Sequence, residues 1–205
     1  GDISSAAFII VAAIIIPGSD IMVKNVGINY FRKGVIEALE KMGAKISIEN
    51  KFTNNFNEPV ADISAKYSKI KGITLDSTYS SRLIDEYPIL AIAAAVASGK
   101  SVFKGLSELR HKESDRFNGI IDGLKASGIK VEAKNDDIVI YGNLSRIKGG
   151  ITINCQYDHR IAMSFLVLGA VAENPIKVIG CNSISTSYPN FISELNSMGT
   201  KIRNE

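Results

Sequence analysis

The chain has 205 residues, of which 45% are hydrophobic and 22% are charged, and its 24 basic and 21 acidic residues leave a net charge of +3. This length is sufficient to bury a sizeable core. The near balance of charge, without a basic run or a basic amphipathic helix, argues against a nucleic-acid or membrane-surface partner.

The first predicted element is an apolar helix over residues 6–16, which ends at Pro17-Gly18. It is shorter than the ~18 to 20 residues of a membrane-spanning helix, and it lacks the basic flank and cleavage site of a signal peptide. The chain starts with Gly1-Asp2 rather than methionine. We therefore expect a fragment of a longer protein.

An internal repeat organises the whole chain. Three times an Asp precedes an apolar helix, a short strand, a polar loop, an amphipathic helix and a Gly that leads into another strand. The copies cover residues 2–46, 85–131 and 158–202, with the Asp and Gly residues at nearly equal intervals: Asp2 and Gly43, Asp85 and Gly128, Asp158 and Gly199. The pattern predicts one structural unit used three times.

The first helix of each repeat is apolar on every side, so it cannot lie at a surface. Three such helices are most economically buried against one another, with the strands and second helices outside. This predicts a single α/β domain over residues 1–205, built around a pseudo-threefold core of helices. The loops that lead into the three helices then converge at one end of the core.

The most charged stretch is Leu-Arg-His-Lys-Glu-Ser-Asp-Arg at residues 109–116. Ser114 or Asp115 can cap the helix that follows, and a helix N-terminus favours an anion. Lys112 and Arg116 add positive charge there, and Glu113 among them is typical of an acid/base group in an anion clamp. The alternative, which spacing alone favours, is a solvated first turn in which Lys112 pairs with Asp115 and Glu113 with Arg116.

Two other residues each have two interpretations. Asp85 lies where a helix cap is expected, as Asp2 and Asp158 do, and capping is the favoured role. It also lies where the helix N-termini converge, so its carboxylate could accept a proton from a substrate. Arg160 could pair with a carboxylate or phosphate, or could simply bind a neighbouring loop carbonyl.

The remaining motifs carry less chemistry. Residues 130–132 and 138–140 predict a hairpin with its tip at 134–137. The sequence has no Gly-rich nucleotide loop, zinc pattern or nucleophile elbow, so we expect no cofactor and no metal. Cys155 and Cys181 lack metal-ligand or disulfide-framework spacing, which predicts free thiols and a cytoplasmic protein.

Four motifs together resemble the 5-enolpyruvylshikimate-3-phosphate synthase family, in that family's order and over nearly the whole chain. They are Gly-Asp-Ile-Ser-Ser-Ala-Ala (1–7), Ile-Asp-Glu-Tyr-Pro-Ile-Leu (84–90), the charged stretch 109–116, and Asp-His-Arg-Ile-Ala-Met (158–163). The resemblance implies an inside-out, barrel-like α/β domain of three βαβαββ-type repeats with buried helices and outer sheets. It also implies the C-terminal half of a two-domain enzyme whose N-terminal domain is absent here.

The family reaction transfers the enolpyruvyl group of phosphoenolpyruvate to the 5-hydroxyl of shikimate-3-phosphate and releases phosphate through a tetrahedral intermediate. The implied partners are these two substrates and the N-terminal domain of the same enzyme, in an intact monomer. No cofactor is implied. Since the substrates would lie between the two halves, we expect the fragment to fold by itself but to turn over little or nothing.

The resemblance also implies roles for individual residues. Asp85 matches the base for the 5-hydroxyl, and Glu113 matches the acid at the methylene carbon. Lys112 is expected to contact shikimate-3-phosphate and the reacting centre, and Arg116 and Arg160 to hold phosphoenolpyruvate. His159 and Glu108 complete the expected substrate-binding set.

Two departures, together with the Asp-Glu-Tyr-Pro-Ile-Leu run at residues 85–90, resemble the branch called class II. Thr186 stands where many members carry a lysine, and Glu108 stands where some carry an asparagine. The glyphosate tolerance known in that branch cannot be inferred, because its main determinant lies in the absent domain. Two alternatives remain: the sister enzyme that acts on UDP-N-acetylglucosamine, from which the Lys-Glu-Ser-Asp-Arg and Asp-His-Arg-Ile-Ala runs differ, and a non-catalytic anion-binding module.

Overall fold

The computed structural model describes residues 1–143 and 147–204. The first repeat contains α1 (Ile3–Ile15), β1 (Asp20–Gly27), α2 (Gly34–Lys41), β2 (Lys45–Thr53) and β3 (Pro59–Lys66). Its strands form an antiparallel sheet in the order β1-β3-β2. In β1 and β2 exposed and half-buried residues alternate over much of the strand, as expected for a sheet with one face toward water.

The second repeat is the largest. It contains β4 (Thr74–Leu75), a 3₁₀ turn η1 (Ser77–Tyr79), α3 (Ser80–Leu83), α4 (Tyr87–Val96), β5 (Gly99–Phe103), a 3₁₀ turn η2 (Ser107–His111), α5 (Arg116–Ala126), β6 (Lys130–Lys134) and β7 (Asp137–Gly142). Its sheet has the order β4-β5-β7-β6, with β4 parallel to β5 and the other pairs antiparallel. The predicted hairpin is β6–β7, paired from Lys130 with Tyr141 to Lys134 with Asp137.

The third repeat contains β8 (Ile151–Asn154), α6 (His159–Gly169), β9 (Ile176–Ile179), α7 (Ile184–Ser187) and α8 (Phe191–Ser197). Its two strands pair in parallel. The strand expected at residues 199–202 is wrong, because this segment has no regular secondary structure. The Gly that ends each amphipathic helix is as predicted: Gly43, Gly128 and Gly199 have φ of 88°, 88° and 96°, in the left-handed region where an L side chain is strained.

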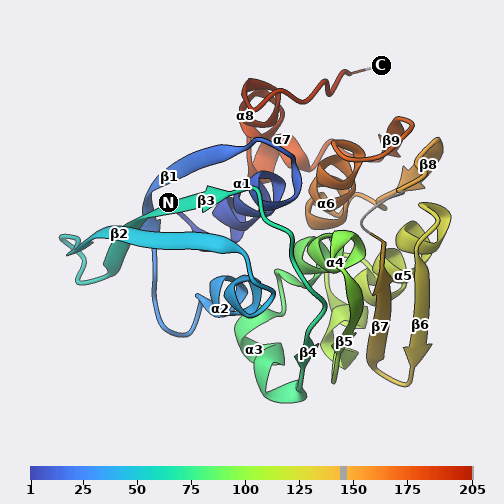
Figure 1. The fold of residues 1–205 in the computed structure, drawn as a ribbon, viewed down its shortest axis with the longest axis horizontal. Coiled ribbons are helices and arrows are strands. Elements are labelled where there is room, and N and C mark those ends of the chain that lie inside the picture. The colour runs from blue at the N-terminus through green and yellow to red at the C-terminus, as the bar shows by residue number, and fades with distance from the viewer. Residues whose placement is uncertain (144–146, 205) are drawn as a thin grey trace.

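The three apolar helices form the core, as predicted from their composition. Every residue of α1 except Ser5 is buried, every residue of α4 is buried, and α6 buries most of its length. The three helices contact one another pairwise, and the sheets lie around them (Figure 1). This arrangement buries helices that are apolar on all sides, because another helix or a sheet covers each of their faces.

The three sheets remain separate. In the described part of the chain, strands of one repeat do not pair with strands of another along a continuous ladder, so no closed barrel forms. The barrel-like closure expected from the sequence is therefore not found, and the strand number differs from repeat to repeat. No helix among the described residues is long and apolar enough to cross a membrane.

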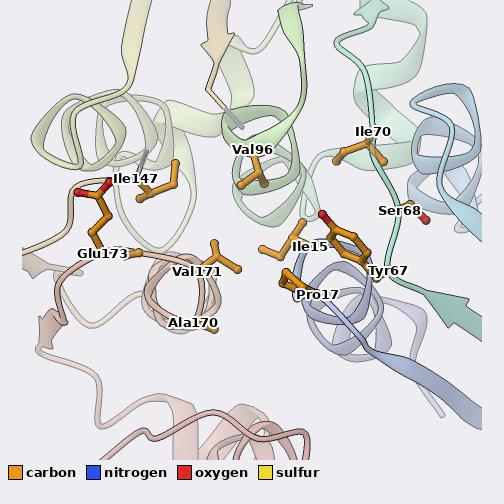
Figure 2. A pocket seen from close by; sticks show the side chains of 11 residues that line it. Ile15, Pro17, Tyr67, Ser68, Ile70, Val96, Ile147, Ala170, Val171 and Glu173 are labelled. Atoms are coloured by element: carbon orange, nitrogen blue, oxygen red, sulfur yellow. The ribbon is translucent and has the colours of Figure 1, made fainter. Parts of the chain in front are cut away.

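The buried helices run in the same direction. Ile15 and Val96, at the C-terminal ends of α1 and α4, and Ala170, directly after α6, line one cavity of about 360 Å³ (Figure 2). Tyr67, Ser68 and Glu173 also line it. The N-terminal ends of the same helices therefore converge at the opposite end of the core, which is where the charged motifs lie.

Candidate active site

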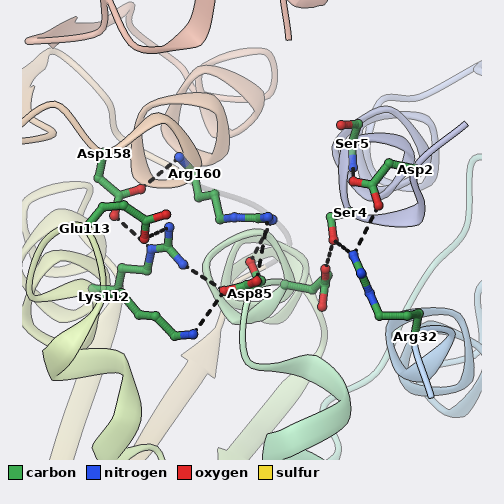
Figure 3. Close-up of polar contacts among 11 residues, drawn as sticks. Asp2, Ser4, Ser5, Arg32, Asp85, Lys112, Glu113, Asp158 and Arg160 are labelled. Carbon is green, nitrogen blue, oxygen red and sulfur yellow. Dashed lines mark hydrogen bonds and ion pairs between the residues drawn. The ribbon is translucent and has the colours of Figure 1, made fainter. Parts of the chain in front are cut away.

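Charged side chains from the second and third repeats form one cluster at the converging helix N-termini (Figure 3). Asp85 lies two residues before α4, and Lys112 and Glu113 lie between η2 and α5. Arg116 is the first residue of α5, Asp158 precedes α6, and Arg160 is the second residue of α6. Each of these residues is at or near the start of a helix that packs in the core, so the core fixes the position of its backbone.

Arg116 lies at the centre of this cluster, and its side chain has no exposed surface. Its Nε donates to Asp158 Oδ2 at 2.8 Å, and its Nη1 donates to Asp85 Oδ1 at 3.1 Å. Its Nη2 lies 2.5 Å from Glu113 Oε2. One guanidinium thus joins carboxylates from three segments, because each of its three nitrogens faces a different one.

Asp85 is the residue on which the cations converge. Besides Arg116, Lys112 Nζ lies 3.5 Å from its Oδ1, and Arg160 Nη2 lies 3.8 Å from its Oδ2. Arg160 Nη1 also donates to the Asp85 backbone carbonyl at 3.3 Å. Arg160 therefore donates to a neighbouring loop carbonyl, as one interpretation predicted, and it also lies near the carboxylate of the same residue.

The favoured role of Asp85 as a helix cap is wrong. Asp2 caps α1 by accepting from Ser5 N–H at 3.1 Å, and Asp158 caps α6 by accepting from the N–H groups of Arg160 and Ile161. Helix α4 begins one residue later than the repeat suggests, with Glu86 at the capping position and without a side-chain capping bond. The Asp85 carboxylate is consequently free to face the cations.

Asp115 is the residue that caps α5, accepting from Asn118 N–H at 3.0 Å. Ser114, the other candidate, donates instead to Asp158 Oδ2 at 3.0 Å. Of the two expected i,i+3 pairs, Glu113 with Arg116 is present, whereas Lys112 pairs with Asp85. The solvated-turn interpretation is therefore wrong for this stretch, because Arg116 is fully buried and most of its partners are distant in sequence.

Neighbouring cations lower the pKa of both Asp85 and Asp158. Burial would raise the pKa of Asp85, but the positive charges of Arg160, Lys112 and Arg116 outweigh it and lower this pKa below its usual value. Burial would also raise the pKa of Asp158, and the hydrogen bond and charge of Arg116 reverse the shift. Both carboxylates are therefore ionised at neutral pH.

His159 responds in the opposite way. Burial lowers its pKa, and the neighbouring Arg160 charge lowers it further. The imidazole is accordingly neutral at neutral pH, and it adds a hydrogen-bonding group rather than a charge to the end of α6.

Comparison with known proteins places this chain in a family. Residues 1–195 match the family model described as EPSP synthase (3-phosphoshikimate 1-carboxyvinyltransferase). The chain belongs to the EPSP synthase family. Curated relatives named 3-phosphoshikimate 1-carboxyvinyltransferase include one from Legionella pneumophila strain Paris, 46% identical over 202 residues, and one from Coxiella burnetii strain CbuK_Q154, 44% identical over 203 residues.

The matches cover 98% and 99% of this chain but only 46% and 45% of those two relatives, so the chain spans about half their length. A solved structure of EPSP synthase from Acinetobacter baumannii superimposes with a TM-score of 0.94 at 44% identity, covering 98% of this chain and 46% of that one. The enolpyruvyl transferase NikO from Streptomyces tendae shares the fold, with a TM-score of 0.74 at 15% identity, covering 98% of this chain and 43% of that one.

Most of the residues that the EPSP synthase resemblance singled out lie together. Asp85, Lys112, Glu113, Arg116 and Arg160 form the cluster, and His159 adjoins it on α6. The outlying residues are Glu108, exposed in η2, and Thr186, whose hydroxyl donates to the Ser183 carbonyl within α7. In the described part of the chain Glu108 forms no ion pair with the cluster. Among the described residues no group of three or more His, Cys, Asp or Glu side chains could hold a metal ion.

The sequence did not reveal a second group of hydrogen-bonded polar side chains, which lies beside Asp85. Glu86 is buried and accepts a hydrogen bond from the Ser4 hydroxyl of α1, and burial raises its pKa. Arg32 donates to the Ser4 hydroxyl at 2.9 Å and to Asp2 Oδ1 at 3.1 Å (Figure 3). The only available signal was a carboxylate directly after Asp85 in a helix start that is otherwise apolar.

Proposed function

We propose that this chain is the C-terminal half of a two-domain EPSP synthase. The whole enzyme would transfer the enolpyruvyl group of phosphoenolpyruvate to the 5-hydroxyl of shikimate-3-phosphate and release phosphate. The observation that carries this proposal is the cluster around Arg116, which combines an ionised Asp85, a half-exposed Glu113 and three cations at one end of a helical core. Family membership supplies the reaction to which this set corresponds.

The chemistry requires a proton removed from oxygen and a proton delivered to carbon. The 5-hydroxyl gives its proton to Asp85 as its oxygen bonds to the substituted carbon of the enol. Glu113 protonates the methylene carbon, for which it must first take up a proton and become a carboxylic acid. The product of this addition is the tetrahedral intermediate. Phosphate then leaves its tetrahedral carbon while the methyl group returns a proton to Glu113, and the double bond of the enolpyruvyl group re-forms. Asp85 is suited to accept a proton because it is ionised, and Glu113 is accessible because 54% of its side chain is exposed.

The cations also have to bind the substrates, since each of the two substrates carries a phosphate and a carboxylate. Lys112 has 27% of its side chain exposed and Arg160 has 15%, so both can reach a ligand without leaving Asp85. Fixed positive groups stabilise the negative charge that accumulates in the transition state. The absent N-terminal half would supply the remaining substrate contacts and close the cleft.

A phosphate-release assay tests the proposal. A full-length protein that carries this chain as its C-terminal half is mixed with phosphoenolpyruvate and either shikimate-3-phosphate or UDP-N-acetylglucosamine. We expect release only with shikimate-3-phosphate, and none from the 205-residue chain alone. Release with UDP-N-acetylglucosamine would assign the sister reaction, and release with neither would favour an anion-binding module. That module would bind phosphate even after Asp85 and Glu113 were replaced, since helix ends and cations suffice.

A further inference from the structure

The cluster neutralises itself. Its three cations, Lys112, Arg116 and Arg160, face three carboxylates, Asp85, Glu113 and Asp158, so the formal charges sum to zero. A substrate with a carboxylate and a phosphate brings at least two further negative charges. It therefore binds these cations more tightly if one of the protein's own carboxylates gives up its partner.

The three carboxylates differ in how firmly they are held. Asp158 has no exposed surface, bonds Arg116 and caps α6. Asp85 is 37% exposed and interacts with all three cations. Glu113 is 54% exposed, and Arg116 is its one ion-pair partner in the described part of the chain. Glu113 is accordingly the group that leaves at the lowest cost.

Arg116 also has one nitrogen with hydrogen-bonding capacity to spare. Nε and Nη1 donate to Asp158 and Asp85 in well-formed hydrogen bonds. Nη2 is buried and lacks such a bond among the described residues, although Glu113 Oε2 lies 2.5 Å from it. The contact with Glu113 is thus one of charge and proximity, and a second carboxylate with better geometry can replace it.

We propose that Glu113 is an internal stand-in for the substrate carboxylate. In the ligand-free protein it occupies the Nη2 side of Arg116. An incoming carboxylate takes that place, and Glu113 is released toward the substrate as the acid/base group. This exchange rests on the proposed function for the identity of the substrate, but it needs only a carboxylate ligand and no turnover.

If this exchange occurs, removal of the Glu113 carboxylate should increase the affinity for carboxylate ligands, which is unusual for a catalytic residue. Glu113→Gln and Glu113→Ala remove the competitor from Arg116, so carboxylate ligands should bind more tightly even though catalysis is lost. Because 54% of the Glu113 side chain is exposed, water screens this ion pair and its contribution is small. Its removal corresponds to a gain in affinity of about two- to fivefold.

The experiment uses the 205-residue chain, with side-chain NMR of Arg116 as the readout and thermal unfolding as a check that each variant is folded. The probes are phosphoenolpyruvate, lactate as a carboxylate without phosphate, and inorganic phosphate as an anion without carboxylate. We expect both carboxylate probes to shift the Arg116 Nη signals, and to bind the two Glu113 variants about two- to fivefold more tightly than wild type. Phosphate should gain less.

Asp122→Asn provides a matched control, because it removes a negative charge from an exposed position of the same helix. Its affinity for all three probes should stay close to that of wild type. Equal gains for lactate and phosphate would indicate a general charge effect and overturn the exchange, as would unchanged, weaker or absent carboxylate binding in the Glu113 variants. The phosphate-release assay is independent of these titrations, so either proposal can fail while the other stands.

Discussion

Replacement of Arg116 tests whether the cluster is structural as well as chemical. Arg116→Ala leaves Asp158 without its ion-pair partner, and neither side chain has any exposed surface in the wild-type protein. Breaking a buried pair by removing one partner costs about 3 to 5 kcal/mol. Asp158 keeps the Ser114 hydroxyl and two backbone N–H donors, so the lower end, about 3 kcal/mol, is expected.

The loss should depend on pH. In wild type the pKa of Asp158 is lowered by Arg116, so this pair contributes stability above the unfolded pKa that is lost as the pH falls through the folded one. In the variant burial still raises the pKa of Asp158, and only the Ser114 hydroxyl and the backbone N–H groups oppose it. The folded pKa is therefore higher than in wild type, and protonation relieves the buried charge. The difference between the two proteins should therefore be largest near pH 7 and should shrink as the solution is acidified toward pH 4.

Thermal and urea unfolding of the 205-residue chain measure this directly. A cost of about 3 kcal/mol corresponds to a fall in Tm of roughly 6 to 12 °C for a protein of this size. Arg116→Lys keeps the charge but loses the fork, and should be intermediate. Lys66→Ala serves as the control, because its pair with Asp20 at 2.8 Å is more than half exposed on both sides and should contribute about 0 to 1 kcal/mol. If Arg116→Ala costs no more than this control, the cluster is not the buried network described here.

Four further substitutions give three separate tests. Gly123→Ala places a Cβ 2.1 Å from the Phe165 ring and should destabilise the protein by about 1 to 3 kcal/mol. Gly119→Ala meets only ordinary contacts at 3.4 Å and should stabilise α5 by about 0.5 to 1 kcal/mol. Urea titration measures both variants, and equal effects would contradict the close packing of α5 against α6. Glu86→Gln should raise Tm near pH 7 and not at pH 4. Burial raises the pKa of the Glu86 carboxyl, so the stability of the wild type falls as the pH rises above the unfolded pKa. An equal gain in Tm at pH 4 and pH 7 would refute this. Asp85→Asn in the full-length protein should lower kcat by about 10²- to 10⁴-fold, far beyond its effect on Tm, and near-normal turnover would exclude Asp85 as the base.

Local pattern was sufficient to predict the helical core. A helix that is apolar on every side has to be buried wherever it occurs, so the burial of α1, α4 and α6 follows from composition. Capping by Asp2 and Asp158 and the left-handed turn glycines also follow, because each depends on a few adjacent residues. The family resemblance extended these local inferences to a set of site residues, most of which the structure brings together.

Only the tertiary structure decided what those residues touch. Arg116 bonds Asp85 across 31 positions and Asp158 across 42, distances in sequence at which no local rule operates. The repeat predicted a third capping aspartate, but docking of α5 and α6 beside α4 gave Asp85 three cations, and their attraction outweighs the value of a cap at a helix that starts one residue later. The sequence by itself thus determined a core of three buried helices with charged ends. How the repeats dock determined that those ends form one self-neutralised cluster, because ion pairing depends on separations in space and not along the chain.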